Sequence, residues 1–428
     1  MNIAIIGAGF TGLAAAYRLV KLGHKVTVFE KDVKPGGLAI GYKEKEWEWT
    51  LEEHYHHWFT NDWHVLNLAK EISYEVVIRR PLTSVFVEDS IFQFDSPKSV
   101  LSFPKLSLVD RVRMAATVGA LRLDPFWKQL EGVNASKFLP RVMGDEAYKM
   151  IWEPLFINKF GKFADQVSLA WFWARITKRT SSLAYPAGGF LKFALALTEK
   201  IIELGGKVNF NSETVMLKKE KGGMVLGVKE GGKEKVYSEF DRVIVTLPSF
   251  LFTKIAPQLP VSYKEGLNKL KGLGATNLVL RLNKKFFSDD TYWLSVCDTS
   301  SPIMAIVEHT NFMDRRHYNN EHIVYLGNYL PADHPNFLKS ERELLSLYDP
   351  YLKKINPGYR KNLIDCRVFK APFAQPIIPP FYSRMIPEYT TPLPGVYLAN
   401  IEQVYPWDRG TNYAVELGQK VAGMVVSR

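Results

Sequence analysis

A short apolar run followed at once by three closely spaced glycines constrains the fold of this chain more than any other feature. Residues 2–6 form a mostly β-branched run, typical of a strand buried on both faces of a parallel sheet. The motif Gly-Ala-Gly-Phe-Thr-Gly follows at 7–12, and apolar side chains then recur at helical spacing over 13–20. A second apolar run, 25–29, is followed directly by Glu30. This order predicts a strand, a tight turn, a helix and a second, parallel strand.

Each glycine of the motif has a separate structural duty. Gly7 permits the tight turn, Gly9 lets a pyrophosphate approach the backbone, and Gly12 lets the helix pack against the sheet. The helix N-terminus offers free N–H groups and a partial positive charge to phosphates. Glu30 lies eighteen residues after Gly12, where its carboxylate can accept hydrogen bonds from both hydroxyls of a ribose. The segment therefore predicts a site for an adenine dinucleotide.

A second glycine pair favours FAD over NAD as this ligand. Gly36-Gly37 follows the second strand and resembles the Gly-Gly loop of the glutathione-reductase-like flavoproteins, which holds the pyrophosphate and the ribityl chain. A domain that binds only a nicotinamide cofactor has no need of this loop. Lys34 stands where those flavoproteins often have arginine, so the positive charge is kept and the bidentate fork is lost.

The composition is that of a globular protein with two or three domains. The chain has 428 residues, of which 46% are hydrophobic and 23% charged, and these values exclude a disordered or collagen-like protein. Cys297 and Cys366 are too few for a disulfide framework or a cysteine-based zinc cluster, which favours a reducing compartment. The longest apolar runs fall short of the roughly 20 residues that cross a bilayer. We therefore expect a cytoplasmic protein, peripheral at a membrane surface if it meets a membrane at all.

The net charge of +11, from 55 Lys and Arg against 44 Asp and Glu, indicates either anionic partners or a solubilising surface. Basic residues are spread along the chain, and no nucleic-acid-binding motif is present. We expect small anionic groups, such as phosphates, sugar nucleotides or acidic lipid headgroups, and no nucleic acid.

Changes of residue pattern divide the chain into two discontinuous domains. The dinucleotide pattern of strands and helices occupies 1–78, 185–265 and 367–428. The first excursion, 79–184, begins with short strands and continues with amphipathic helical segments rich in Trp and Phe. The second, 266–366, alternates β-type segments with one helical segment, which is typical of a half-exposed antiparallel sheet. The predicted fold class is α/β, or α+β overall, with an inserted substrate domain of antiparallel sheet and helices.

These motifs together resemble the flavin-containing amine oxidase superfamily, especially its protoporphyrinogen-oxidase-like and carotenoid-desaturase-like branches. The segments that carry the resemblance are Gly7–Gly12, Glu30, Gly36-Gly37, Tyr185–Gly189, Asp241–Pro248 and Gly395–Ala422. The resemblance implies a Rossmann-like FAD-binding domain of the glutathione-reductase type, assembled from three stretches, that meets the substrate domain at the flavin ring.

The resemblance also implies which residues hold the cofactor. The strand near Val208 passes the adenine, and the helix that begins near Thr411 places its positive end where it stabilises a reduced flavin. Asp408, before that helix, is a further candidate. The expected FAD-binding residues are Gly7, Gly9, Phe10, Thr11, Gly12, Glu30, Lys31, Gly36, Gly37, Leu38, Val208, Asn400, Glu402, Gly410, Thr411 and Asn412.

Two departures from the family pattern narrow the chemistry. No cysteine lies near the C-terminal motif, where some amine oxidases attach FAD covalently, so we expect non-covalent FAD. Many amine oxidases carry a lysine on a strand where this chain has Thr276 or Asn277. That absence argues against amine oxidation coupled to oxygen.

His56 and His57 are the candidates for residues beside the flavin. They belong to a stretch, 54–61, that is similar to the histidine-containing loop of UDP-galactopyranose mutases, in which a histidine lies close to the flavin. An imidazole there could tune flavin N5 or carry a proton. The alternative is that both are ordinary polar residues at the end of an element. No further ligands at suitable spacing accompany them, so we expect no metal.

The sequence thus predicts an FAD-dependent oxidoreductase of oxidase, dehydrogenase or desaturase type. Hydride transfer to or from flavin N5 would act on a bulky, apolar small molecule, for which the aromatic excursion suits a pocket. The alternative is a flavin-dependent isomerase of a sugar nucleotide, like UDP-galactopyranose mutase, and a flavin-bound scaffold is a third reading. The isomerase needs arginines over a diphosphate, and its candidates are Arg175, Arg179, Arg281 and Arg384.

Overall fold

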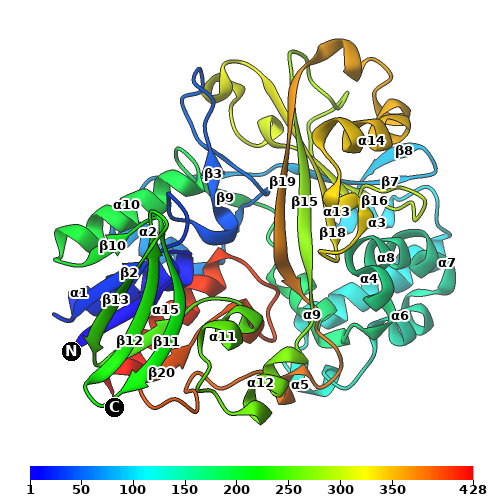
Figure 1. Cartoon of the computed structure of the whole chain (residues 1–428). Coiled ribbons are helices and arrows are strands. Elements are labelled where there is room, and N and C mark those ends of the chain that lie inside the picture. The colour runs from blue at the N-terminus through cyan, green and yellow to red at the C-terminus, as the bar shows by residue number, and fades with distance from the viewer. Residues whose placement is uncertain (428) are drawn as a thin grey trace.

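The computed structural model describes residues 1–427, and one of its two main sheets is a five-stranded parallel sheet (Figure 1). The strand order is β10-β2-β1-β14-β20, so three distant stretches of the chain build one sheet. The strands are β1 (Asn2–Ile6), β2 (Lys25–Phe29), β10 (Lys207–Asn209), β14 (Arg242–Val245) and β20 (Val396–Leu398). The predicted strand–turn–helix–strand unit is confirmed at the amino end, where β1 pairs in parallel with both β2 and β14.

Helices from opposite ends of the chain pack together beside this sheet. Figure 1 shows α1 (Phe10–Lys21) next to α15 (Thr411–Val426), with α10 (Phe190–Glu203) also against α1. Gly418 of α15 faces the backbone of α1, because a Cβ atom there would overlap the carbonyl oxygen of Thr11. This glycine lets the two helix axes come close, and it thereby fixes where the N-terminus of α15 lies.

The predicted hairpin-rich stretch forms a separate antiparallel sheet of three strands. These strands are β11 (Ser212–Glu220), β12 (Gly223–Glu230) and β13 (Lys233–Phe240). They are joined by tight turns at the predicted Gly-Gly pairs, and Gly223, Gly231 and Gly232 have positive φ. The chain returns from this sheet directly into β14 of the parallel sheet.

The second large sheet has seven strands in the order β19-β15-β18-β17-β16-β7-β8. All neighbours are antiparallel except β16 and β7. The strands are β7 (Leu82–Val87), β8 (Ser90–Gln93), β15 (Gly272–Leu282), β16 (Thr291–Val296), β17 (Ala305–Glu308), β18 (His322–Leu330) and β19 (Leu363–Pro376). β19 runs ten residues past the predicted end of the second excursion at 366, because its ladder with β15 continues to the pair Gly272 and Pro376.

A layer of helices from the first excursion lies beside this sheet. Its members are α3 (Pro97–Leu101), α4 (Leu108–Leu123), α5 (Trp127–Leu130), α6 (Ala135–Met143), α7 (Asp145–Ala147), α8 (Glu153–Phe160) and α9 (Leu169–Lys178). Phe156, Phe160, Trp171 and Phe172 are almost fully buried and pack on one another. Much of the predicted aromatic content therefore builds the core of this layer.

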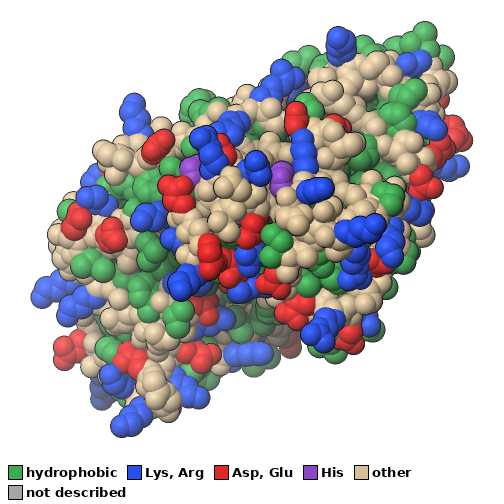
Figure 2. Space-filling model, turned by 90° about the horizontal axis from the view of Figure 1, so that it is seen from above, with side chains coloured by type: hydrophobic (Ala, Val, Ile, Leu, Met, Phe, Trp, Pro, Cys, Tyr) green, Lys and Arg blue, Asp and Glu red, His purple; other side chains and the backbone are tan. Residues whose placement is uncertain are grey.

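Shorter elements connect the two halves. They are β3 (Gly41–Tyr42) with β4 (Leu51–Glu52), the sheet of β5 (Trp58–Phe59), β9 (Leu183–Pro186) and β6 (Val76–Arg79), and the helices α2 (Trp63–Glu71), α11 (Ser249–Ile255), α12 (Val261–Asn268), α13 (Pro335–Leu338) and α14 (Glu341–Ile355). Among the helices of residues 1–427, none combines the length and the apolar character that crossing a bilayer requires. On the face seen in Figure 2, Lys and Arg are spread out with Asp and Glu between them.

A buried glutamate ties these connecting elements together. Glu52 has no exposed surface, and its carboxylate accepts hydrogen bonds from the Tyr185 hydroxyl (2.7 Å) and the Phe190 backbone N–H (2.8 Å). Burial raises the pKa of Glu52 to about 7. An acid with a raised pKa binds extra protons in the folded state, so the stability of the protein falls as the pH rises from about 4.5 to about 7.

Glu52→Gln is therefore expected to remove part of the pH dependence of stability. The unfolding free energy of the wild type, relative to that of the variant, should fall by about 3 kcal/mol between pH 4.5 and pH 8, because the wild type loses its buried proton over that interval. Denaturant titrations at several pH values measure this difference. Glu46→Gln, at an exposed position of the preceding segment, is the control. Equal pH slopes in the wild type and Glu52→Gln would show that the carboxyl group does not titrate in this range.

Candidate functional site

Two glycine loops touch at the carboxyl end of β1 and form a cradle of backbone. The Gly36 N–H donates to the Ala8 carbonyl (3.0 Å), and a Cβ atom at Gly37 would lie 3.0 Å from Gly9 Cα. Gly9 caps α1 with no side chain bonded to the first turn, so the helix presents free N–H groups there. Gly7 makes the turn with φ of +106°. The first glycine motif and the second glycine pair thus lie side by side. The free N–H groups of α1 at this place can bind an anion.

Glu30 lies at the end of β2, directly beside this cradle. Its carboxylate is buried and accepts hydrogen bonds from the N–H groups of Ala8 (2.6 Å) and Asp32 (3.0 Å). Burial raises its pKa, and a carboxylate with two donors still has lone pairs for further hydrogen bonds. Val208 lies on the neighbouring strand β10, paired with Val28, and Lys31 is exposed next to Glu30. The structure therefore brings Glu30 and Val208 together.

The Phe10 side chain faces away from the cradle. The Phe10 ring stacks on Phe193 with centroids 5.7 Å apart and meets Phe190 edge-on, inside the core between α1 and α10. Thr11 is buried beneath α15. Phe10 can therefore contact a ligand at the cradle only through its backbone.

The N-terminus of α15 is held by its own side chains. Thr411 Oγ1 accepts a hydrogen bond from Trp58 Nε1 (2.6 Å), and Asn412 Oδ1 accepts from the backbone N–H groups of His64 (3.0 Å) and Val65 (3.2 Å), in the first turn of α2. Gly410, which precedes the helix, leaves open space around its Cα. The side chains of Thr411 and Asn412 thus position α15, and its backbone N–H groups remain for a ligand.

Asn400 and Glu402 are also bonded within the protein. Glu402 Oε2 accepts from the Ser249 N–H (2.8 Å), and Asn400 Nδ2 donates to the Leu247 carbonyl (3.0 Å). Burial raises the pKa of Glu402. Both residues anchor the loop that leads from β20 to α15 onto the segment after β14.

A cavity lies where the seven-stranded sheet meets the second glycine loop. It is lined by Leu38, His54, Tyr55, His56, Ala275, Asn277, Asn328, Tyr329, Ala374 and Arg409. Thr276 and Asn277, the two positions named for the family lysine, lie in the middle of β15, and of the two it is Asn277 that lines the cavity. Its Oδ1 is buried and has no hydrogen-bond partner among the residues that the structure describes. A buried acceptor of this kind can take a hydrogen bond from a bound molecule or from an ordered water.

The histidines of the loop 54–57 are neutral. Burial lowers the pKa of His54 and His57 to about 3 and that of His56 to about 4. His56 lines the cavity, with Nδ1 2.5 Å from the His54 carbonyl oxygen, and His54 contacts Asn277. His57 points to the Tyr292 hydroxyl (3.1 Å) and does not line the cavity. Within residues 1–427, no group of three or more His, Cys, Asp or Glu is arranged to hold a metal ion.

The four arginines named for a diphosphate do not converge. Arg281 is bound by Glu321 in two hydrogen bonds of 2.7 Å, and the Arg384 guanidinium lies over Phe381. Arg175 bonds Asp408 (3.2 Å), and Arg179 lies one turn further along the chain. Of the four, this last pair lies near the cavity, because Arg175 lowers the pKa of the lining residue Tyr55 and both arginines lower that of the neighbouring His57.

Sequence reasoning missed Lys159, Tyr329 and Arg409. Tyr329 and Arg409 line the cavity, and the Lys159 ammonium lies 5.0 Å from the centroid of the Tyr329 ring. The available signal was Lys159 itself, a lysine next to Phe160 on an otherwise apolar helix face. The three residues lie far apart in the sequence, so their spacing could not show that they meet in the fold.

Comparison with known proteins assigns the family. The model of the family described as flavin containing amine oxidoreductase matches residues 10–425, nearly the whole chain. The 4,4'-diapophytoene desaturase of Staphylococcus haemolyticus is 54% identical over 44 residues, which cover 10% of this chain and 9% of that protein. The chain thus matches about a tenth of the length of this curated relative.

Solved structures with the same fold cover the whole chain. The putative protoporphyrinogen oxidase of Exiguobacterium sp. 255-15 has a TM-score of 0.75 at 15% identity, over 100% of this chain and 99% of that one. Reduced UDP-galactopyranose mutase has a TM-score of 0.77 at 15% identity, over 100% and 95%. These likenesses establish a mixed α/β fold with one parallel and one largely antiparallel sheet. With the family model over residues 10–425, they confirm the predicted resemblance: the chain belongs to the flavin containing amine oxidoreductases.

Proposed function

We propose that this enzyme holds FAD without a covalent bond and exchanges hydride equivalents between flavin N5 and a carbon atom of a bulky, largely apolar substrate. When bound, the flavin supplies the two-electron chemistry, and the protein supplies binding and orientation. The observation that carries this proposal is that the second glycine loop joins the cradle at Gly37 and lines the cavity at Leu38, where Asn277 has an acceptor without a partner among the described residues.

The residues present fit such a cofactor. The cradle of Gly9 and Gly37 carries no side chain that would block a pyrophosphate, and Glu30 stands ready for ribose hydroxyls. The N-terminus of α15 at Gly410 offers N–H groups beside Arg409, which lines the cavity. This arrangement supports a dinucleotide-binding domain of the glutathione-reductase type with an inserted substrate domain.

We infer that the residues around the cavity position the substrate and exclude water from it. His54 and His56 are uncharged, so they act as hydrogen-bonding groups rather than as proton donors at neutral pH. Asn277 provides a neutral amide where a lysine would provide a charge. This difference argues against amine oxidation coupled to oxygen and supports hydride transfer at the carbon atom of another kind of substrate. Tyr55, Ala275 and Ala374 complete the lining with mostly apolar surface.

Anaerobic spectroscopy of the purified protein tests the proposed reaction. Bleaching of the flavin by an organic reductant, followed by recovery of the colour with an electron acceptor, is the expected result. A flavin whose spectrum stays the same with every reductant and every acceptor tried would indicate a scaffold and contradict the proposal.

An isomerase acting on a sugar nucleotide is the second candidate. Arg175 and Arg179 near the cavity, together with the fold shared with UDP-galactopyranose mutase, support it. The test incubates the chemically reduced protein with UDP-galactopyranose under anaerobic conditions. Conversion of the sugar with no consumption of reductant would favour the isomerase over the oxidoreductase.

The non-covalent attachment makes a separate prediction. No cysteine lies within the segment 367–428, so no thiol of that segment can bond to the flavin ring. Precipitation of the protein with acid is expected to release all of the flavin into the supernatant, where absorbance at visible wavelengths measures it. Colour that stays in the pellet after washing would demonstrate a covalent bond.

A further inference from the structure

Four basic side chains surround a single carboxylate on the helical side of the cavity. They are Lys159 of α8, Arg175 of α9, Arg179 just after α9, and Arg409 just before α15, and together with Asp408 they are called the cation cluster below. They come from three separate segments, so the cluster is a product of the tertiary fold.

The Asp408 carboxylate contacts several neighbouring groups at once. Its Oδ2 lies 3.2 Å from the Arg175 guanidinium and 3.9 Å from Lys159 Nζ, and the second distance exceeds that of a hydrogen bond. Its Oδ1 accepts from Trp171 Nε1 (3.2 Å) and from the Arg409 backbone N–H (3.1 Å). The Arg409 guanidinium bonds only neutral groups, Gln375 and Tyr329. Asp408 therefore cannot satisfy the cations around it.

Three guanidinium groups and one carboxylate give the cluster a net charge of +2, and Lys159 raises it to +3 when it is protonated. Asp408 is the carboxylate that acts most strongly on both Lys159 and Arg179. The Lys159 side chain is only 10% exposed, and burial lowers its pKa well below the ordinary value. Burial and then Arg175 lower the pKa of Arg179, yet a guanidinium keeps its proton. Buried positive charge of this kind is stabilised when an anion binds.

The pyrophosphate of the cofactor does not account for this charge. The glycine cradle lies at the carboxyl end of β1 in the parallel sheet, whereas Lys159, Arg175 and Arg179 belong to the helical layer of the substrate half, and of the four cations only Arg409 adjoins the N-terminus of α15. The neutral histidines of the loop 54–57 add no charge to the cavity.

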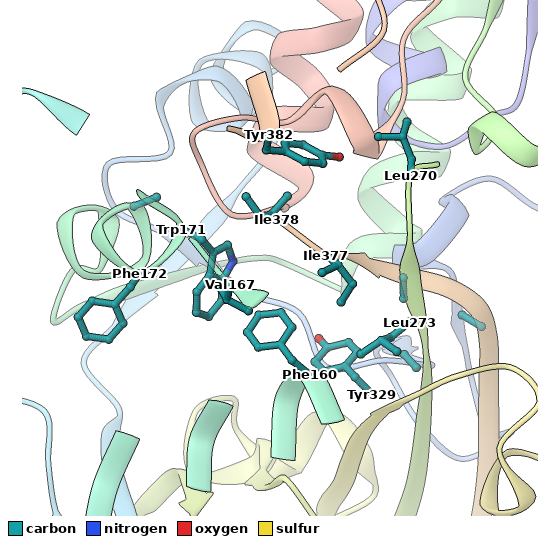
Figure 3. Close-up of a cluster of buried hydrophobic side chains, with 14 of the residues drawn as sticks. Phe160, Val167, Trp171, Phe172, Leu270, Leu273, Tyr329, Ile377, Ile378 and Tyr382 are labelled. Carbon is teal, nitrogen blue, oxygen red and sulfur yellow. The ribbon is translucent and has the colours of Figure 1, made fainter. Parts of the chain in front are cut away.

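An apolar wall adjoins the cluster. The Lys159 ammonium lies 5.0 Å from the ring centroid of Tyr329 and 5.3 Å from that of Trp171. Figure 3 shows Trp171 and Phe160 of the helical layer together with Tyr329 and Ile377 from the seven-stranded sheet and its continuation. Of these four residues Tyr329 lines the cavity, so a ligand that reaches from the cavity to the cluster would have cations at one end and the Tyr329 ring beside them.

We propose that Lys159, Arg175, Arg179 and Arg409 bind an oxyanion of the substrate, a carboxylate or a phosphate. The substrate is then amphipathic, with an apolar body toward the cavity and an anionic group on the cluster. This inference rests on the proposed function, since it assigns the substrate class of the same cavity.

Ligands with a common chain and different head groups test it. The flavin-loaded protein is titrated with decanoate, decyl phosphate and 1-decanol below their micellar concentrations, by calorimetry and by the visible flavin spectrum. At least one of the two anions should bind about tenfold more tightly than the alcohol and shift the flavin band. Binding by decanoate alone or by decyl phosphate alone identifies which oxyanion is preferred. Equal affinities for all three ligands, or anion binding that leaves the flavin spectrum unchanged, would overturn the inference.

Variants separate the cluster from general surface charge. Lys159→Met and Arg179→Gln should each weaken binding of the preferred anion about tenfold and leave 1-decanol unaffected, whereas Asp408→Asn should strengthen it. Lys162→Met removes an exposed cation near Lys159 and is the matched control, with no change expected. Wild-type affinity in both Lys159→Met and Arg179→Gln would refute the assignment. If one of these variants does not fold, the other and Asp408→Asn still decide.

The two proposals fail in different ways. A colourless protein that binds decanoate by calorimetry, and loses that binding in Arg179→Gln, would refute the proposed cofactor and keep the anion site. A yellow protein that is reduced by organic donors but prefers 1-decanol would keep the cofactor and refute the anion site.

Discussion

Gly9→Val is expected to yield a folded protein that is purified without flavin. Gly9 has φ of −69° and ψ of 171°, which valine adopts readily, and a Cβ atom there would lie 3.7 Å from Gly37 Cα, an ordinary contact. The fold therefore tolerates the side chain, but its methyl groups fill the space through which phosphates approach the backbone. The affinity for FAD should fall at least about 100-fold, equivalent to about 2.7 kcal/mol.

The flavin content per chain and the unfolding temperature measure this outcome together. Gly266→Val on α12 is the matched control, because a Cβ atom at Gly266 meets no atom within 4 Å. The control should be as yellow as the wild type. Full flavin content in Gly9→Val would place the pyrophosphate elsewhere.

Gly418→Ala is expected to lower the free energy of unfolding more than alanine at the other glycine of α15. A Cβ atom at Gly418 would overlap the Thr11 carbonyl oxygen and lie 3.0 Å from Ala14 Cβ. Neither α1 nor α15 can move away without disturbing the cradle and the parallel sheet. Overpacking at such a contact costs about 3 kcal/mol of unfolding free energy.

Gly423→Ala, in the same helix, is the control for this stability prediction. A Cβ atom there meets nothing within 4 Å, so alanine should gain up to about 1 kcal/mol from its higher helix propensity. Denaturant titration of both variants gives the comparison. Equal stabilities of Gly418→Ala and Gly423→Ala would contradict the close packing of α1 on α15.

The part of the site that sequence could predict is the part encoded locally. β1, the glycine turn, α1, β2 and Glu30 follow one another within thirty residues, and each residue type has one conformational or hydrogen-bonding reason for its place. The second glycine loop lies close behind in sequence and meets the first in space. Local geometry alone therefore predicts where this cradle forms.

Roles that depend on tertiary partners could not be predicted in the same way. Position at the start of a helix suggested Thr411 and Asn412 as ligand contacts, and in the structure Trp58 and the first turn of α2 occupy their side chains. Of the two candidate histidines, His56 lines the cavity while His57 turns to Tyr292, a residue 235 positions away. Helical spacing places Phe10 on α1 and does not show that its ring enters the core.

The same limit applies to charge. Lys159 and Asp408 are separated by 249 positions, so no sequence window contains both, and the imbalance of the cation cluster becomes visible only in the folded chain. Asn277 was noted from the resemblance, together with Thr276, as a departure from a family lysine. Its orphaned acceptor is a property of the packing around it.

The flavin content of the unmodified protein, expressed with riboflavin freely supplied, tests the central claim most directly. We predict a yellow protein that carries about one FAD per chain and releases it as intact FAD on denaturation. A colourless protein that takes up no FAD when the cofactor is added would contradict the account of the cradle, the cavity and the family's chemistry in this chain.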